Sequence, residues 1–392
     1  MEYLAVLGRQ PEISIAELEA LFGKVQKISE KIAIFDAKNP KIERLGGSLK
    51  LAQKLDKKPL EYLANLPNGK ITLGVSDYSR NASRKTAVTE ALKFKKILVR
   101  HKRSVRVVEN KEAMLSTAAS LHNGLSGKNE RKIEFIKLNN DWYKVIGVQD
   151  IDAYTKRDQA RPARDAFVGM LPPKLAQILI NLCGPLPADS VVLDPFCGTG
   201  VVLQEALLMG YKAYGTDLSE RMVEYTEKNL SWLIDNKKGT LKTIRDNGSG
   251  MSKEPHNDGR DEASPKSTFL LSNGDATSFQ WIQPINAIAC EGYLGKPFSK
   301  IPTGIELKEQ KQECKSIVLG FLKNLANQIK PDTPVTIAIP AWLQENDNYE
   351  RLEILDDINK MGYNVENKSR EGLLYHRANQ VVARDIIILR KK

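Results

Sequence analysis

Apolar and polar residues alternate in short runs along the first 150 positions, and longer amphipathic segments lie between these runs. Short runs rich in apolar residues predict strands, and the strands are expected over residues 2–8, 32–36, 71–75 and 104–109. Ile15, Leu18 and Leu21 recur at helical spacing, which predicts a helix beginning near Ser14. Two more helices are expected, a lysine-rich one ending near His101 and one over residues 111–125. A hairpin is expected over residues 131–150, with its turn at 139–141.

The pattern changes near residue 171 to a regular alternation of helices and strands, which indicates a parallel sheet. The expected strands are 190–194, 212–217, 269–273, 285–289 and 333–342, followed by a helix over 349–362. Residues 372–392 are expected to form a hairpin around Ala378–Asn379 that supplies an antiparallel last strand. Residues 236–268 are polar and contain no aromatic residue, and they are expected to form a mobile surface loop.

These patterns divide the chain into an α+β region over residues 1–155, a polar linker over 156–170, and an α/β domain over 171–392. The length of 392 residues, with 41% hydrophobic and 27% charged residues, also favours two or more globular domains. We find no apolar run that could span a bilayer and no basic leader at the N-terminus, so a cytoplasmic protein without a membrane segment is expected. Four scattered cysteines support neither a disulfide framework nor a metal site.

The net charge of +11 lies entirely in residues 1–150, whereas the remaining residues carry no net charge. The basic density peaks in one segment that holds a single acid, Glu90, before Glu109. Its basic residues are Arg84, Lys85, Lys93, Lys95, Lys96, Arg100, Lys102, Arg103 and Arg106. A solvated helix face is one interpretation of this run, but the asymmetry over the whole chain favours a nucleic-acid-binding surface.

The strongest chemical motif follows the strand 190–194. This strand ends in Asp194, and after it come Phe196, Cys197, Gly198, Thr199, Gly200 and an apolar helix closed by Gly210. Glycines at a strand-to-helix turn let the backbone approach a ligand, and the amides at the helix start are free to bind it. A dinucleotide-binding motif would require a third glycine where this chain has Leu203, so a nicotinamide or flavin site is disfavoured.

Two further acids follow later strands. Asp217 ends the strand 212–217, 23 residues after Asp194, where a carboxylate can accept both hydroxyls of a ribose. Asp275 is expected at the end of the third strand, within residues 269–279, and suits an adenine amino group. Each acid alone is as well explained as a turn former or a helix cap. Together with the glycine turn they predict a pocket for an adenosine that carries no phosphate.

The residues Asp194–Gly200, then Gly215–Ser219, then Gly274–Ala276, resemble motifs I to III of the class I S-adenosylmethionine-dependent methyltransferases, a Rossmann-like fold with a seven-stranded, mostly parallel sheet. The Asp-Pro-Phe-Cys-Gly-Thr-Gly form is typical of enzymes that methylate exocyclic amines. The resemblance implies S-adenosylmethionine as cofactor, with these binding residues: Asp194, Phe196, Cys197, Gly198, Thr199, Gly200, Asp217, Leu218, Asp275 and Ala276.

The resemblance extends to the rest of the chain. Residues 157–182 are similar to the segment before motif I in the archaeal and eukaryotic tRNA (guanine-10-N2)-methyltransferases, and residues 104–125 are similar to a THUMP core. This implies an N-terminal ferredoxin-like and THUMP module that binds tRNA, which agrees with the position of the basic charge. Some relatives require a small activating subunit, so such a partner is also conceivable.

The chain departs from this family at the fourth strand of the sheet. Amine methyltransferases of this type have (Asp/Asn)-Pro-Pro-(Tyr/Phe) there, and this chain has Glu291, Gly292, Tyr293 and Leu294. Glu291 takes the position of the acid and would accept from the target amine, while Gly292 and Tyr293 replace the two prolines. Leu294 falls where the aromatic residue belongs, and Tyr293 would stack on the base from the neighbouring position. Three interpretations stay open: an active enzyme with a rebuilt site for guanine N2, a methyltransferase for another base or for DNA, and an inactive tRNA-binding protein that retains the cofactor pocket.

Overall fold

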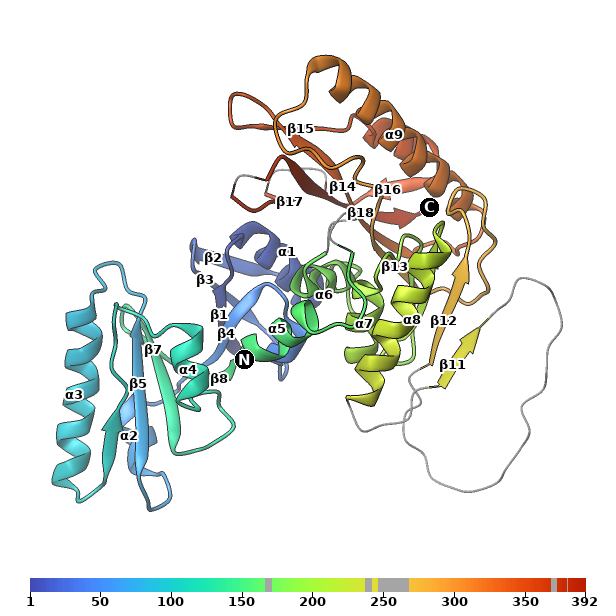
Figure 1. Ribbon diagram of the computed structural model, residues 1–392. Helices are drawn as coiled ribbons and strands as arrows, with labels where there is room; N and C mark the ends of the chain where they lie inside the picture. Colours follow the sequence, from blue (N-terminus) through green and yellow to red (C-terminus); the bar gives the residue numbers. More distant parts are fainter. Residues whose placement is uncertain (166–170, 237–241, 246–267, 368–371, 379) are drawn as a thin grey trace, which may run out of the picture. The chain divides into compact units, whose positions relative to one another are not determined.

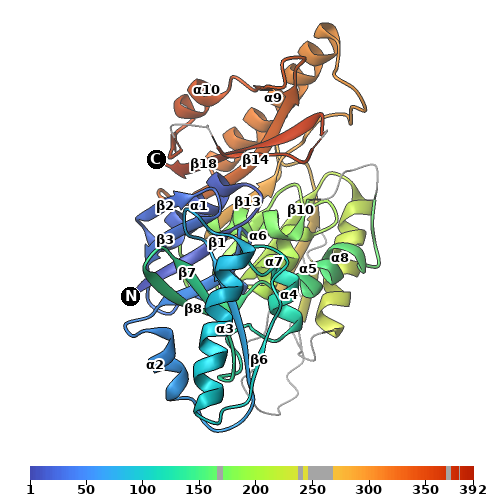
Figure 2. The same cartoon turned by 90° about the vertical axis from the view of Figure 1, so that its left-hand side faces the viewer.

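The computed structural model describes residues 1–165, 171–236, 242–245, 268–367, 372–378 and 380–392. The chain forms two compact units, Met1–Thr155 and Lys156–Lys392, and each has its own sheet and its own cores (Figure 1; Figure 2). Within the described residues, no helix combines the length and the hydropathy needed to cross a membrane.

The N-terminal unit is built on one eight-stranded sheet. The strand order is β2 (Val25–Ser29), β3 (Ile32–Asp36), β1 (Glu2–Leu7), β4 (Ser48–Lys54), β8 (Asp141–Val148), β7 (Lys132–Leu138), β5 (Ile71–Asp77) and β6 (Val105–Val107). β5 runs parallel to both β6 and β7, and the other pairs are antiparallel. The hairpin of β7 and β8 turns at Asn139, whose φ of 54° is tolerated by asparagine. The expected hairpin is therefore confirmed, while β2 and β4 were not predicted.

Four helices and one 3-10 turn belong to this unit. They are α1 (Pro11–Phe22), η1 (Ile42–Arg44), α2 (Pro59–Ala64), α3 (Arg84–Arg100) and α4 (Thr117–His122), and α5 (Ile151–Gln159) crosses the boundary to the second unit. α1 begins at Pro11 and not near Ser14, because proline fits the first helical turn. α4 is shorter than expected, because the Ser116 side chain caps it by accepting from the Ala119 amide.

Helix α3 lies beside β5, and its apolar stripe fixes which of its residues face solvent (Figure 1). Ala87, Ala91, Phe94 and Leu98 recur every three or four residues, and all four are buried. Ala91, Phe94 and Leu98 pack with apolar residues of α2, β5, β6 and β7 in one core. The lysines and arginines of α3 therefore lie on its other faces.

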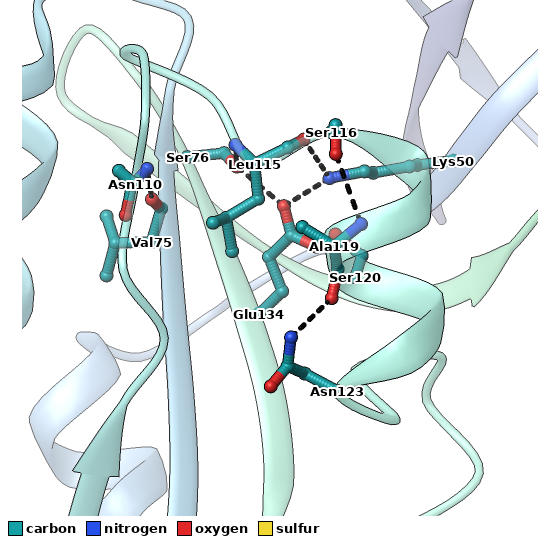
Figure 3. Close-up of polar contacts among 10 residues, drawn as sticks. All are labelled: Lys50, Val75, Ser76, Asn110, Leu115, Ser116, Ala119, Ser120, Asn123 and Glu134. Carbon is teal, nitrogen blue, oxygen red and sulfur yellow. Dashed lines mark hydrogen bonds and ion pairs between the residues drawn. The ribbon is translucent and has the colours of Figure 1, made fainter.

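A fully buried ion pair connects several elements of the N-terminal unit (Figure 3). Lys50 Nζ of β4 donates to Glu134 Oε1 of β7 at 2.6 Å and to the Leu115 carbonyl at 2.8 Å. Glu134 also accepts from the hydroxyls of Ser76 and Ser120, each at 2.6 Å. The two charged side chains are 1% and 0% exposed, so the pair is shielded from water and its hydrogen bonds define one arrangement of β4, β5, β7 and α4.

The second unit contains a mostly parallel sheet in the order β11 (Lys242–Arg245), β12 (Thr268–Asn273), β10 (Lys212–Asp217), β9 (Val191–Asp194), β13 (Ala287–Glu291), β14 (Pro334–Leu343), β18 (Val382–Lys391) and β16 (Tyr363–Val365). β18 is antiparallel to its neighbours β14 and β16, as the sequence predicts for the last strand. Two short strands, β15 (Tyr349–Arg351) and β17 (Leu374–Tyr375), pair with β14 and β18. The predicted Rossmann-like α/β class is confirmed, with more strands than the expected seven.

Helices cover both faces of this sheet. α9 (Gly304–Ala326) buries Val318 and Phe321 in a core that includes Leu193, Ile288 and Ile337. α6 (Pro173–Leu182) lies on the other face, since the thiol of Cys183 at its C-terminus contacts Thr336, the neighbour of Ile337 in the strand. α7 (Val201–Leu208) and α8 (Glu220–Asp235) follow β9 and β10, and α10 (Leu355–Lys360) precedes β16.

Three expectations for this half need correction or lie beyond the described residues. The expected loop over 236–268 contains strand β11, which pairs with β12; its residues 237–241 and 246–267 lie outside the described part. The expected helix over 349–362 is only α10, because residues 349–351 pair with β14 as β15. The expected linker 156–170 begins inside α5, and its residues 166–170 lie outside the described part, as does Asn379 of the C-terminal hairpin.

Candidate active site

The glycine-rich turn joins β9 to α7 at the carboxyl edge of the parallel sheet. Gly198 and Gly200 have φ values of 51° and 79°, a backbone conformation that residues other than glycine adopt only with strain. A Cβ on Gly200 would lie 2.7 Å from Thr226 Cγ2, so this glycine is required for packing against α8. A Cβ on Gly198 would meet only the Phe196 carbonyl, at 3.9 Å, and so this position faces open space.

Asp217 at the end of β10 is directly connected to this turn. Its Oδ2 accepts from the Gly198 amide and its Oδ1 from the Ser219 amide, both at 2.9 Å. Burial raises the pKa of the Asp217 carboxyl, and the two amides oppose this effect. The side chain is only partly buried, so the carboxylate can accept hydrogen bonds from a ligand that lies against Gly198.

Asp194, the first of the three predicted acids, is almost completely buried at 2% exposure. Its Oδ1 accepts from the Phe196 amide at 3.1 Å, which fixes the start of the turn. Burial raises the pKa of this carboxyl well above its usual value, and the carboxylates of Asp217 and Glu291 raise it further. The burial also raises the pKa of the Cys197 thiol, so that Cys197 is a neutral thiol and no nucleophile at neutral pH.

The remaining predicted cofactor residues lie at the ends of β10 and β12. Leu218 is 73% exposed, although it directly follows Asp217. Such an exposed apolar side chain beside a carboxylate can pack on an aromatic ring of a ligand. Strand β12 ends at Asn273, whose side chain donates to the carbonyls of Asp217 and Leu218. Asp275 is exposed and accepts from the amide and hydroxyl of Thr277 through Oδ1, and Ala276 is buried.

Residues 157–165 hold the glycine turn from outside the sheet, a role that sequence inspection missed. Arg161 is 3% exposed and donates to the hydroxyl of Thr199 at 3.3 Å. Asn229 of α8 donates to the carbonyls of Thr199 and Ala163, both at 2.9 Å. Arg157 forms an ion pair with the buried Glu205 of α7 at 2.6 Å. These contacts connect the segment before motif I to both helices that follow the turn.

Glu291 ends β13 at the same edge of the sheet. Its carboxylate accepts through Oε1 from the Nε–H of Arg384, a residue of β18. The two side chains are 15% and 6% exposed, so the ion pair is largely buried but still reaches the surface. Gly292 continues the pairing with β14, since its amide donates to the Ala338 carbonyl at 2.9 Å. Nothing in the sequence connects Arg384 to Glu291, because 93 positions separate them.

Tyr293 follows Gly292 in the chain and is half-buried. Its hydroxyl donates to Glu313 of α9 at 3.3 Å, and its ring packs against the core that α9 covers. Burial raises the pKa of Tyr293, and Glu313 raises it further. The phenol is therefore neutral and its position is fixed by α9.

The nine predicted RNA-binding residues lie on and after α3, in the N-terminal unit. Three of them hold parts of this unit together. Arg84 pairs with Glu109 at 3.0 Å, Arg103 donates to the Leu66 and Pro67 carbonyls, and Arg106 donates to Asn123. Lys93 lies 4.0 Å from Glu90. The others, Lys85, Lys95, Lys96, Arg100 and Lys102, are exposed or half-exposed and can approach a polyanion.

Comparisons with known proteins find methyltransferases. A family model of N6/N4 methyltransferases, described as DNA methylase, matches residues 25–228. The tRNA (guanine(10)-N2)-dimethyltransferase of Pyrococcus abyssi is 30% identical over 241 residues, which cover 59% of this chain and 68% of that protein. The protein of the same description from Methanothermobacter thermautotrophicus is 49% identical over 75 residues, 19% of this chain and 22% of that protein.

A solved structure also matches over the full length. The crystal structure of TrmN from Thermus thermophilus covers 100% of both chains, with 15% identity and a TM-score of 0.44. Three curated relatives of this description match over shorter segments, which span 22%, 28% and 35% of their own lengths.

Proposed function

We propose that this chain transfers a methyl group from S-adenosylmethionine to the exocyclic N2 amine of a guanosine in tRNA. The premise is that it belongs to the class I methyltransferase family that contains the tRNA (guanine(10)-N2)-dimethyltransferases. One observation carries the proposal. A glycine turn, the carboxylate of Asp217 and the carboxylate of Glu291 lie at the carboxyl edge of one parallel sheet, where ligands bind in open α/β folds.

The residues at this edge fit S-adenosylmethionine. The open space at Gly198 admits the ligand close to the backbone, and Asp217 offers carboxylate oxygens for the ribose hydroxyls. The exposed Leu218 offers an apolar surface for the adenine ring. The buried Asp194, together with Phe196, Cys197, Thr199 and Gly200, shapes the turn, and Asp275 and Ala276 border the site on the side of β12.

Glu291 is proposed as the acceptor for the target amine. When bound, S-adenosylmethionine supplies a methyl group on a sulfonium sulfur, and the electron pair of the broken sulfur–carbon bond stays with that sulfur. Glu291 accepts a hydrogen of the amine, which turns the nitrogen lone pair toward the methyl carbon. As the nitrogen–carbon bond forms, the amine loses one proton to the Glu291 carboxylate. Tyr293 stacks on the base. The hydrogen bond from the Gly292 amide to β14 holds the backbone between Glu291 and Tyr293 in place.

The N-terminal unit is proposed to be a ferredoxin-like and THUMP module that holds the tRNA. Its excess of basic residues and the exposed lysines of α3 support this assignment. Because tRNA is the substrate, we place the protein in the cytoplasm. The need for a small activating subunit stays a prediction. It is tested by measuring the activity of the purified chain by itself.

The test is to incubate the purified protein with S-adenosylmethionine and unmodified tRNA, and then to identify methylated nucleosides by mass spectrometry after digestion. N2-methylguanosine is expected with the wild-type protein and with a control variant, Glu366→Gln, whereas Glu291→Gln should lose it. Methylated adenine or cytosine, in RNA or in duplex DNA offered in parallel, would instead support a different target. Binding of both tRNA and cofactor without any methylation would contradict catalysis by the chain alone.

A further inference from the structure

The loss of two prolines after Glu291 poses a physical problem for the proposed site. Two consecutive prolines restrict the backbone and so present an acceptor in a fixed place. This chain has Gly292 and Tyr293 there, and glycine is the least restricted residue. Glutamate is also longer by one methylene than aspartate, so it has one more rotatable bond. An acceptor built in this way needs another source of rigidity.

Strand β18 supplies a candidate for this source of rigidity, the side chain of Arg384. Arg384 is the third residue of β18 in its antiparallel pairing with β14, where it lies opposite Pro340, and it also pairs with Tyr375 of β17. A backbone that is paired on both sides is held firmly in the sheet. The Arg384 side chain is 6% exposed, so surrounding atoms restrict its rotamers as well.

We propose that Arg384 is a positioning residue that holds the Glu291 carboxylate in the orientation in which it receives the target amine. Its Nε–H binds Oε1 of Glu291, and the guanidinium does not rotate freely, because it is planar and buried. Oε2 of Glu291 is then the oxygen that accepts from the amine. The pair thus performs, through a strand two places away in the sheet, the task that the prolines perform in the related motif.

Two alternatives make different predictions. A pair that only stabilises the fold would change thermal stability and leave the rate of methyl transfer per folded molecule unchanged. A pair that occupied the carboxylate and blocked it would slow the reaction, so that removing Arg384 would raise the rate. The proposed role requires that loss of Arg384 lowers kcat while the affinity for S-adenosylmethionine stays the same.

The experiment compares Arg384→Gln and Arg384→Lys with Arg390→Gln, in the full chain, with the folded fraction of each variant checked by thermal unfolding. Arg390 belongs to the same strand and pairs with Glu366 at 3.0 Å, well away from the site, so it is a matched control. We expect kcat to fall about 100-fold in Arg384→Gln, because a misplaced acceptor costs roughly that factor. Arg384→Lys should recover part of the rate, and Arg390→Gln should retain it.

A second readout does not depend on turnover. Guanosine and inosine monophosphates differ only in the exocyclic amine, so the wild-type protein with bound S-adenosylhomocysteine should prefer guanosine monophosphate by roughly 10-fold, the value of one hydrogen bond to a charged group. Arg384→Gln should lose this preference. Unchanged kcat and preference in Arg384→Gln would overturn the positioning role and leave the proposed function intact. Since the inference rests on that function, absence of methyl transfer by the wild-type protein would overturn both.

Discussion

The backbone amide of Gly198 donates to Oδ2 of Asp217 at 2.9 Å, which connects the glycine turn after β9 to the acid at the end of β10. Each of these features is common by itself. Their contact means that the turn and the acid border the same space, and that a ligand against Gly198 must also meet the Asp217 carboxylate.

This contact predicts the effect of removing Asp217. Asp217→Ala should weaken the binding of S-adenosylmethionine by roughly 100-fold or more, because the ribose loses two charged hydrogen-bond acceptors. Affinity for tRNA should be retained. Calorimetry with the cofactor measures the first effect, and Asp235→Asn, an exposed acid at the end of α8, is the control. Cofactor affinity equal to that of the wild type would rule out the proposed ribose contact.

The exposed lysines of α3 should govern the binding of tRNA. Lys95→Ala combined with Lys96→Ala should weaken binding fairly evenly across RNA sequences and reduce the slope of log affinity against log salt by about 1.5, since two phosphate contacts disappear. The control is the combination of Lys323→Ala and Lys330→Ala, two exposed lysines of the second unit. A slope that does not change in the α3 variant would place the RNA on another surface.

The buried pair of Lys50 and Glu134 should be important for the stability of the N-terminal unit. Lys50→Met leaves the Glu134 carboxylate in the core without its cation, which should lower the free energy of unfolding by about 3–5 kcal/mol. The double variant with Glu134→Gln should lose less than the sum of the single effects. Chemical denaturation of the four proteins measures this coupling. Strictly additive effects would mean that the two side chains do not stabilise each other.

The burial of the Asp194 carboxyl predicts that the stability of the protein depends on pH. Burial raises its pKa in the folded chain, so the folded state binds the proton more tightly than the unfolded state does. Stability is therefore lost as the pH rises from the ordinary aspartate pKa of about 4 through the raised value. Asp194→Asn keeps the oxygen that accepts from the Phe196 amide and should raise the unfolding midpoint at pH 7 by about 2 °C or more, but not at pH 3.

A thermal unfolding series over this pH range checks the prediction. Glu345→Gln, which changes an exposed carboxylate of the same unit, should leave the midpoint unchanged at every pH. A midpoint of Asp194→Asn that lies below the wild-type value at pH 7 would mean that the carboxylate form is stabilised by its surroundings despite its burial.

Local patterns determined much of this protein from the sequence alone. Short apolar runs predicted β1, β3, β5, β9, β10 and β14, because a strand that is buried in a sheet is apolar over most of its length. The lysine-rich segment was predicted to form a helix that ends near His101, and α3 ends at Arg100. The glycine turn and the strand-terminal acids were also readable, since a parallel sheet brings the carboxyl ends of its strands to one edge.

Contacts between distant segments were decided only by the tertiary structure. The short strands β2, β11, β15 and β16 have weak patterns of their own and exist because a neighbouring strand offers hydrogen bonds. Arg384 meets Glu291 across a strand that neither residue belongs to, and Lys50 meets Glu134 across 84 positions. The sequence shows that each of these residues is charged, but it does not show which of them pair. Their pairing depends on the order of the strands, which is a property of the folded sheet.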